Sequence, residues 1–245
     1  LISEAYSLLK NRKGLDNDAM AVVFDEWNGG ELDSFLIEIT ANILRFRDED
    51  GKPLLDKILD VAGQKGTGKW SAIAAMDEND PLTLITEAVY ARLLSALYPE
   101  RIKAASLYSG KLKVESGKLS DNAQLSIEDV RQALYAAKLI SYAQGFSLLR
   151  HASEHYGWDL DYGTIARIWR KGCIIRSVFL QKITEAYRKD PDLENLLFDD
   201  FFHTKIQEAL PAWRRVVAEG ALSGVALPAM SSALNYFDGL RTLYS

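Results

Sequence analysis

Residues 126–157 read SIEDVRQALYAAKLISYAQGFSLLRHASEHYG and contain the longest regular pattern of the chain. Apolar residues recur there every three to four positions, the period of an α-helix. Ser126, with Asp129 three residues later, forms an acidic variant of a capping box, and Gly157 is the residue type that commonly ends a helix. We therefore predict one helix over Ile127–Tyr156, long enough to cross an entire domain.

The same period dominates the rest of the chain, so the sequence predicts an all-α fold. A strand-like alternation is confined to Lys111–Glu115, within a polar stretch from Gly110 to Asn122 that we expect to be a surface loop. A last helical pattern covers Ala233–Leu243. The other expected helices are Leu1–Lys13, Asn17–Asn28, Glu31–Phe46, Pro53–Ala62, Lys69–Met76, Pro81–Leu97, Pro99–Leu107, Gly163–Arg170, Ile174–Arg188 and Phe202–Ala218.

Short motifs recur between the two halves of the chain. The run SLLK at 7–10 matches SLLR at 147–150, and Trp27 with Gly30 matches Trp169 with Gly172. Ile-Thr at 39–40 likewise matches Ile-Thr at 183–184. Three matches in the same order indicate a duplicated multi-helix unit, with the halves packed about a pseudo-two-fold axis. We therefore treat residues 1–245 as a single large helical domain.

A glycine-rich run, GQKGTGKW at 63–70, is the strongest sign of a ligand site. Glycines allow a ligand to approach the backbone closely, and Lys65 and Thr67 supply a cation and a hydroxyl donor. A helix that starts near Lys69 would add the positive end of its dipole. These features favour a phosphate group as the ligand, while a simple turn between two helices is the alternative interpretation.

The run also has the spacing of a nucleotide-binding P-loop, but its context argues against that function. A P-loop needs Ser or Thr after its lysine to hold magnesium, and this chain has Trp70 there. A P-loop also follows a strand, whereas Pro53–Ala62 has the apolar spacing of a helix.

Arg92 is the second candidate for phosphate binding. Asp80 and Pro81 form a cap signal for a mostly apolar helix, and Arg92 lies within it, so we expect its guanidinium on a largely buried element. A charge in such a place needs a partner. A phosphate would suit its planar fork of donors, and an ion pair with Glu87 is the alternative.

Several segments together resemble the C-terminal helical domain of 6-phosphogluconate dehydrogenase. The resemblance runs along the whole chain, and in the loop it departs only at Ser71, where the family usually has threonine. The matching segments are EWNGGEL at 26–32, ILDVAGQKGTGKWS at 58–71, LITEAVYAR at 84–92, LISYAQGF at 139–146 and IWRKGCIIR at 168–176.

This resemblance implies a role in the oxidative decarboxylation of 6-phosphogluconate to ribulose 5-phosphate, with hydride transfer to NADP, in the pentose phosphate pathway. Lys65, Thr67 and Arg92 match family positions that bind the substrate phosphate. The acid/base lysine and glutamate of the family precede the position of Leu1, so no catalytic residue is assigned here. The Rossmann domain that binds most of the NADP also lies upstream, and a C-terminal tail follows. The resemblance further implies a homodimer in the cytoplasm.

The ends of the sequence fit this interpretation. Leu1 is not a methionine, and the first helical pattern has no cap before it, so the chain reads as a piece of a longer protein. We therefore expect the isolated chain to be inactive. A non-catalytic helical assembly module that binds a phosphorylated small molecule is the alternative function.

Composition excludes several other classes. The net charge of −5 argues against nucleic-acid binding, and no segment has the apolar length of a membrane span. The single cysteine, Cys173, excludes an internal disulfide framework, and its apolar surroundings predict a buried, inert thiol. His151 and His155 lie one helical turn apart but lack a third ligand, so we expect exposed residues and no metal site.

Overall fold

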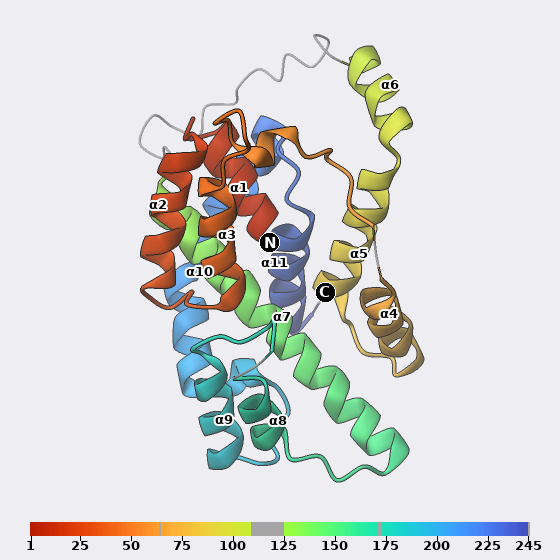
Figure 1. The fold of residues 1–245 in the computed structure, drawn as a ribbon. Helices are drawn as coiled ribbons and strands as arrows, with labels where there is room; N and C mark the ends of the chain where they lie inside the picture. The colour runs from red at the N-terminus through yellow and green to blue at the C-terminus, as the bar shows by residue number, and fades with distance from the viewer. Residues whose placement is uncertain (64, 109–124, 171–172, 245) are drawn as a thin grey trace.

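The computed structural model describes residues 1–63, 65–108, 125–170 and 173–244 (Figure 1). Within these ranges the chain forms eleven α-helices and two 3-10 turns, Leu54–Lys57 and Leu196–Phe198. β pairing in the same ranges consists of two isolated bridges, so the all-α prediction is confirmed. None of the helices in these ranges is long and apolar enough to cross a membrane.

The predicted long helix is present with the predicted bounds, α7 (Ile127–Tyr156). Ser126 Oγ accepts a hydrogen bond from the Asp129 N–H at 2.9 Å, and the Asp129 carboxylate accepts one from the Ser126 N–H at 2.9 Å. Gly157 ends the helix with a φ of +65°, where glycine carries no steric penalty. The capping signals in the sequence therefore set both ends of this helix.

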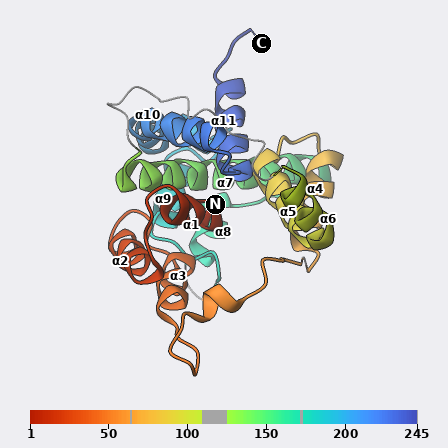
Figure 2. The ribbon, with the colours of Figure 1, turned by 90° about the horizontal axis from the view of Figure 1, so that it is seen from above.

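Helix α7 runs through the centre of the molecule, as Figures 1 and 2 show. It packs against α1 (Ile2–Asn11), α5 (Thr83–Ala96), α10 (Asp200–Ser223) and α11 (Pro228–Leu240). The hydrophobic core contains large side chains with almost no solvent exposure, namely Phe24, Phe146, Phe202 and Trp213. The Trp213 indole N–H donates to the Met230 carbonyl at 3.1 Å, so its one polar group is satisfied inside this core.

Two helix pairs are joined by an antiparallel contact between the segments that precede their second helices. They are α2 (Asn17–Asn28) with α3 (Phe35–Arg45), and α8 (Tyr162–Ile168) with α9 (Leu180–Lys189). The segments before α3 and α9 pair antiparallel at Ser34 and Ser177. The Phe35 N–H donates to the Arg176 carbonyl at 3.3 Å, and the Val178 N–H donates to the Asp33 carbonyl at 3.2 Å. Phe35 and Val178 directly follow the two paired serines, and Asp33 and Arg176 directly precede them, so the two hydrogen bonds are symmetric. This symmetry supports a repeated unit for the two helix pairs.

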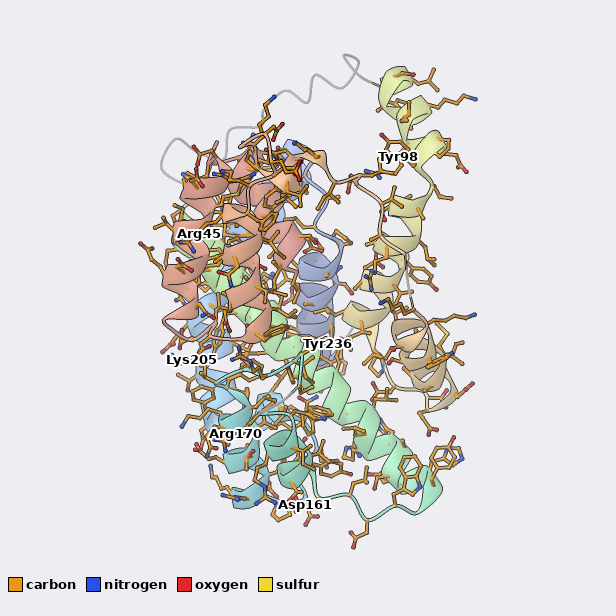
Figure 3. The ribbon with its side chains drawn as sticks, in the orientation of Figure 1. Arg45, Tyr98, Asp161, Arg170, Lys205 and Tyr236 are labelled. Carbon is orange, nitrogen blue, oxygen red and sulfur yellow. The ribbon has the colours of Figure 1, made fainter. Side chains whose placement is uncertain are left out.

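Helices α4 (Thr67–Asp77), α5 and α6 (Tyr98–Tyr108) form an arm beside the central bundle (Figures 1 and 2). The arm meets the bundle through α5, which packs on α11 and α7. Leu84 is the one residue of α5 that is fully buried, and the described part of α6 buries none. Figure 3 shows Tyr98 at the junction of α5 and α6, away from the bundle.

Several helix predictions were wrong in extent. Helix α3 starts four residues later than predicted, α10 ends five residues later, and α11 starts five residues earlier. Two further differences follow from packing. Residues 53–62 form only the 3-10 turn Leu54–Lys57 followed by irregular backbone, because Ile58 and Leu59 are exposed and find no core to pack against. Helix α9 starts at Leu180 and not at Ile174, because residues 176–178 pair antiparallel with residues 33–35. The predicted alternation at Lys111–Glu115 lies outside the described residues.

The start of α5 also differs from the prediction. The helix begins at Thr83, and Asp80 does not cap it, because the Asp80 carboxylate accepts hydrogen bonds from Ser147 of α7 at 2.6 Å and contacts His151 at 2.7 Å. The buried Gln144 side chain of α7 caps the helix in its place. Its Oε1 accepts from the Leu84 N–H at 3.1 Å, and its amide donates to Thr83 Oγ1 at 2.9 Å.

Candidate functional site

The glycine-rich loop ends where α4 begins. Gly66 precedes the helix with a φ of +104°, a conformation that side chains disfavour, and Thr67 is the first helical residue. A Cβ atom added to Gly68 would lie 2.8 Å from Cγ2 of Val89 on α5. The absence of a side chain at Gly68 therefore lets the first turn of α4 approach α5 closely at Val89.

The start of the loop is also attached to α5. The Ala62 N–H donates a hydrogen bond to Ser95 Oγ at 2.9 Å. Ala62 therefore lies beside Ser95 and Gly68 lies beside Val89, in the reverse order along α5. Arg92 is three residues from each of these two anchor positions, so all three lie along one stripe of the helix. The structure thus places Thr67 in the first turn of α4, next to α5, the helix that carries Arg92, and Lys65 precedes Thr67 by two residues.

The surroundings of Arg92 differ from the prediction. Leu84 is the one buried residue of its helix, the others are half-buried or exposed, and Arg92 itself is exposed, so the expectation of a largely buried element was wrong. The apolar residues around it lie at the surface because no other part of the chain that the structure describes covers them. Among the described residues, neither Arg92 nor Lys65 forms an ion pair, and the alternative partner Glu87 is not bonded to Arg92. Two cations therefore remain available to a ligand.

Two cavities flank the loop and its anchors. One has a volume of about 750 Å³ and includes Thr67 and Ser71 of α4 in its wall, opposite Leu1–Ser3 of α1 and Lys138 and Tyr142 of α7. The other, of about 810 Å³, lies between α1, α5 and α11 and includes Asp60, Ser95 and Arg101. Both cavities therefore lie between the arm and the central bundle.

Lys138 is a charged group that the sequence reasoning missed, because nothing in the helical pattern distinguishes it from a surface lysine. Its side chain is half-buried, and its ammonium donates to Ser177 Oγ at 2.9 Å and lies 5.0 Å from the centre of the Phe179 ring. Burial lowers the pKa of Lys138 to about 8, and the charge of Asp33 opposes this shift only in part. The neighbouring Tyr142 hydroxyl donates to the Ile175 carbonyl at 2.8 Å, and burial raises its pKa.

The lowered pKa of Lys138 predicts a pH-dependent stability. Between about pH 8 and the usual lysine pKa of 10.5, the unfolded chain holds this proton and the folded chain does not, so the free energy of unfolding should rise with pH. Lys138→Met removes this contribution. We expect the variant to be more stable than the wild type near pH 7, with an advantage that shrinks toward pH 10. Urea unfolding at several pH values measures the difference, and a difference that does not change with pH would contradict the assignment.

The remaining candidate groups do not form a second site. His151 is half-buried and contacts Asp80, while His155 is exposed and contacts Glu78 at 2.8 Å. Cys173 is partly exposed, so the prediction of a buried thiol was wrong; its neighbours in sequence, Ile174 and Ile175, lie at the surface. No cluster of three or more His, Cys, Asp or Glu residues suited to a metal occurs in the described part of the chain.

Comparison with known proteins identifies the family. A model of the 6-phosphogluconate dehydrogenase C-terminal domain matches residues 1–245. The chain belongs to the 6-phosphogluconate dehydrogenase family. Decarboxylating 6-phosphogluconate dehydrogenases from Cunninghamella elegans and Homo sapiens are 55% and 54% identical to it over 241 residues, or 98% of this chain. The match covers 49% of each of these proteins, so the chain spans about half the length of its relatives.

A solved structure agrees with this family assignment. The Plasmodium falciparum 6-phosphogluconate dehydrogenase, studied in its apo form, with its cofactor NADP+ and with its substrate 6-phosphogluconate, superposes with a TM-score of 0.94. The two sequences are 40% identical, and the match covers 100% of this chain and 52% of that one. The fold described above is therefore the helical fold of this family.

Proposed function

We propose that this chain is the substrate-binding and dimer-forming domain of an NADP-dependent 6-phosphogluconate dehydrogenase. The proposed reaction is the oxidative decarboxylation of 6-phospho-D-gluconate to D-ribulose 5-phosphate and CO2, carried out in the cytoplasm. The observation that carries the proposal is the position of Arg92, an exposed guanidinium without an ion pair among the described residues, between the two points where the glycine loop meets α5.

Three residues would bind the phosphate group of the substrate. Lys65 would act as a point charge, Thr67 as a neutral hydrogen-bond donor at the start of α4, and Arg92 as a planar fork for two phosphate oxygens. The positive end of the α4 dipole adds to this attraction. Binding the remote phosphate holds the reacting carbons of the substrate in register with groups elsewhere in the enzyme.

The proposed reaction needs groups that the described residues do not supply. The described residues contain no parallel sheet, and no G-x-G-x-x-G follows a strand pattern, so they do not fit the main NADP site. We place that site, and the acid/base residues, in the part of the relatives that this chain does not cover.

Turnover assays test this proposal. The full-length protein should reduce NADP with 6-phosphogluconate and release CO2, and the 245-residue chain alone should show no measurable rate. Formation of NADPH is followed by its absorbance. A full-length protein that binds 6-phosphogluconate without any turnover would favour the non-catalytic assembly module, and a fully active 245-residue chain would contradict the division of roles.

A homodimer is the second part of the proposal. The arm exposes many large apolar side chains to solvent. The exposed fraction is 67% for Trp70, 64% for Met76 and 61% for Leu94. Further exposed members are Ile73, Tyr90, Leu93, Leu97, Ile102, Leu107 and Tyr108. Monomeric proteins rarely expose an apolar surface of this extent, and a second copy of the chain would cover it.

Sedimentation velocity at micromolar concentration tests the dimer. We expect a dimer for the wild type, a shift toward monomer for Leu94→Asp on the arm, and no shift for the control Val22→Asp, which changes a similarly exposed residue of α2. A monomeric wild type would count against the proposal.

A further inference from the structure

Residues 58–62 lead into the glycine loop without helical structure, so other groups must fix their path. Arg101, on α6, is the main one. Its Nη1 donates to the Asp60 carbonyl at 2.7 Å and to the Ser95 carbonyl at 3.1 Å. Its Nη2 donates to the Asp60 carboxylate at 2.6 Å. One guanidinium therefore joins the segment before the loop to the C-terminal end of α5, the helix that carries Arg92.

Ser95 makes a second connection beside the first. Its hydroxyl accepts from the Ala62 N–H at 2.9 Å and donates to the Arg92 carbonyl at 2.7 Å. Asp60 and Ala62 are thus both fixed to the end of α5, and Lys65 follows Ala62 by three residues. A displacement at Asp60 or Ala62 would pass directly to the loop, since so few residues separate them.

The composition of the loop makes such anchors important. Glycines at 63, 66 and 68 give the loop more backbone freedom than other residues would. A free loop of this kind would lose conformational entropy whenever Lys65 and Thr67 closed on a ligand. Anchors that hold its start in place reduce this cost before the ligand arrives.

We propose that Arg101 is a positioning residue for phosphate binding, which fixes the loop bearing Lys65 and Thr67 relative to Arg92. This inference rests on the proposed function, because it assumes that these three residues bind the substrate phosphate. Arg101 itself does not touch the substrate in this proposal. Its effect is transmitted through the backbone of residues 60–62.

An ordinary surface ion pair between Arg101 and Asp60 is the simpler interpretation of the same contact. The side chains are 35% and 81% exposed, and pairs of this kind contribute little to stability. The two interpretations differ in which acceptor matters. A surface ion pair needs the carboxylate, whereas the positioning role depends on the two backbone carbonyls, which hold separate segments together.

Steady-state kinetics of the full-length protein distinguish them. Arg101→Ala should raise the KM for 6-phosphogluconate about tenfold or more, while kcat and the KM for NADP stay within about twofold, because the lost interaction orders the phosphate site alone. Arg101→Lys should recover part of the loss, since an ammonium can reach only some of these acceptors. Asp60→Asn, which keeps the backbone carbonyl, should change the KM by no more than about twofold.

Arg214→Ala is the matched control. Arg214 forms a comparable pair with Asp238 between α10 and α11, away from the loop, and its loss should leave all three kinetic constants unchanged. The inference is overturned if Arg101→Ala behaves like this control, if Asp60→Asn has the same effect as Arg101→Ala, or if kcat and both KM values change together. If the wild type turns over 6-phosphogluconate and Arg101→Ala does not differ from it, the proposed function stands and only the positioning role fails. If the wild type shows no turnover, both fail.

Discussion

Replacement of Arg92 by alanine is expected to lower kcat/KM of the full-length protein for 6-phosphogluconate about a hundredfold, or about 2.7 kcal/mol, the range found when one partner of a hydrogen-bonded charge pair is removed. The guanidinium has no ion pair among the described residues, so its replacement should not disturb an existing contact of its side chain. The loss should therefore appear in substrate kinetics and not in stability. Arg92→Lys should lose about tenfold, because an ammonium keeps the charge but not the planar fork.

Arg188→Ala provides the control for this experiment. Arg188 is also exposed and forms no ion pair in the described part of the chain, but it lies on α9. Its replacement should leave kcat/KM within about threefold of the wild type, the range usual for a surface substitution. If Arg92→Ala and Arg188→Ala gave the same small effect, Arg92 would not belong to the phosphate site, and the assignment of the loop would need another partner.

Replacement of Glu4 by alanine is expected to lower the free energy of unfolding by about 3 kcal/mol. Glu4 of α1 is 7% exposed, and its carboxylate accepts hydrogen bonds from the N–H groups of Ala229 at 2.7 Å and Met230 at 2.9 Å. These N–H groups belong to the first turn of α11, which has no side-chain cap of its own. Alanine would leave both donors buried without an acceptor.

Urea unfolding of the 245-residue chain, followed by circular dichroism, measures this loss. Glu4→Gln should lose about half as much as Glu4→Ala, because its amide retains one acceptor oxygen. Asp18→Ala is the control, since Asp18 is a largely exposed carboxylate paired with Arg47, and its removal should cost less than about 0.5 kcal/mol. Equal losses for Glu4→Ala and Asp18→Ala would contradict the role of Glu4 as the cap of α11.

Local sequence signals gave correct predictions where the structural feature depends on residues that are close in the sequence. The capping box at Ser126 and the glycine at 157 gave both ends of α7, and the apolar period gave its length. The glycine loop was also present where it was predicted, because the glycine at 66 meets a local requirement, a positive φ. The choice of Lys65, Thr67 and Arg92 as ligand residues depended on the resemblance to a family in addition to these signals.

Other features of the site could not be predicted from the sequence. Ser95 and Arg101 hold the start of the loop through partners that lie 33 and 41 residues away, and no local pattern marks either residue. The exposed apolar face of the arm was also missed. Its residues have the spacing of a buried helix, and sequence cannot tell whether the group that buries such a face belongs to the same chain.

The sequence by itself determined the helical class, the extent of α7 and the place of the glycine loop, because each depends on interactions within a few residues. Only the tertiary structure decided how α5 begins. The sequence offers Asp80 as its cap, but the folded chain gives Asp80 to Ser147 and His151 and caps α5 with Gln144 of α7. The physical reason is that polar groups at a helix end must be satisfied by whichever partner the packing brings near, and packing joins residues that the sequence keeps far apart.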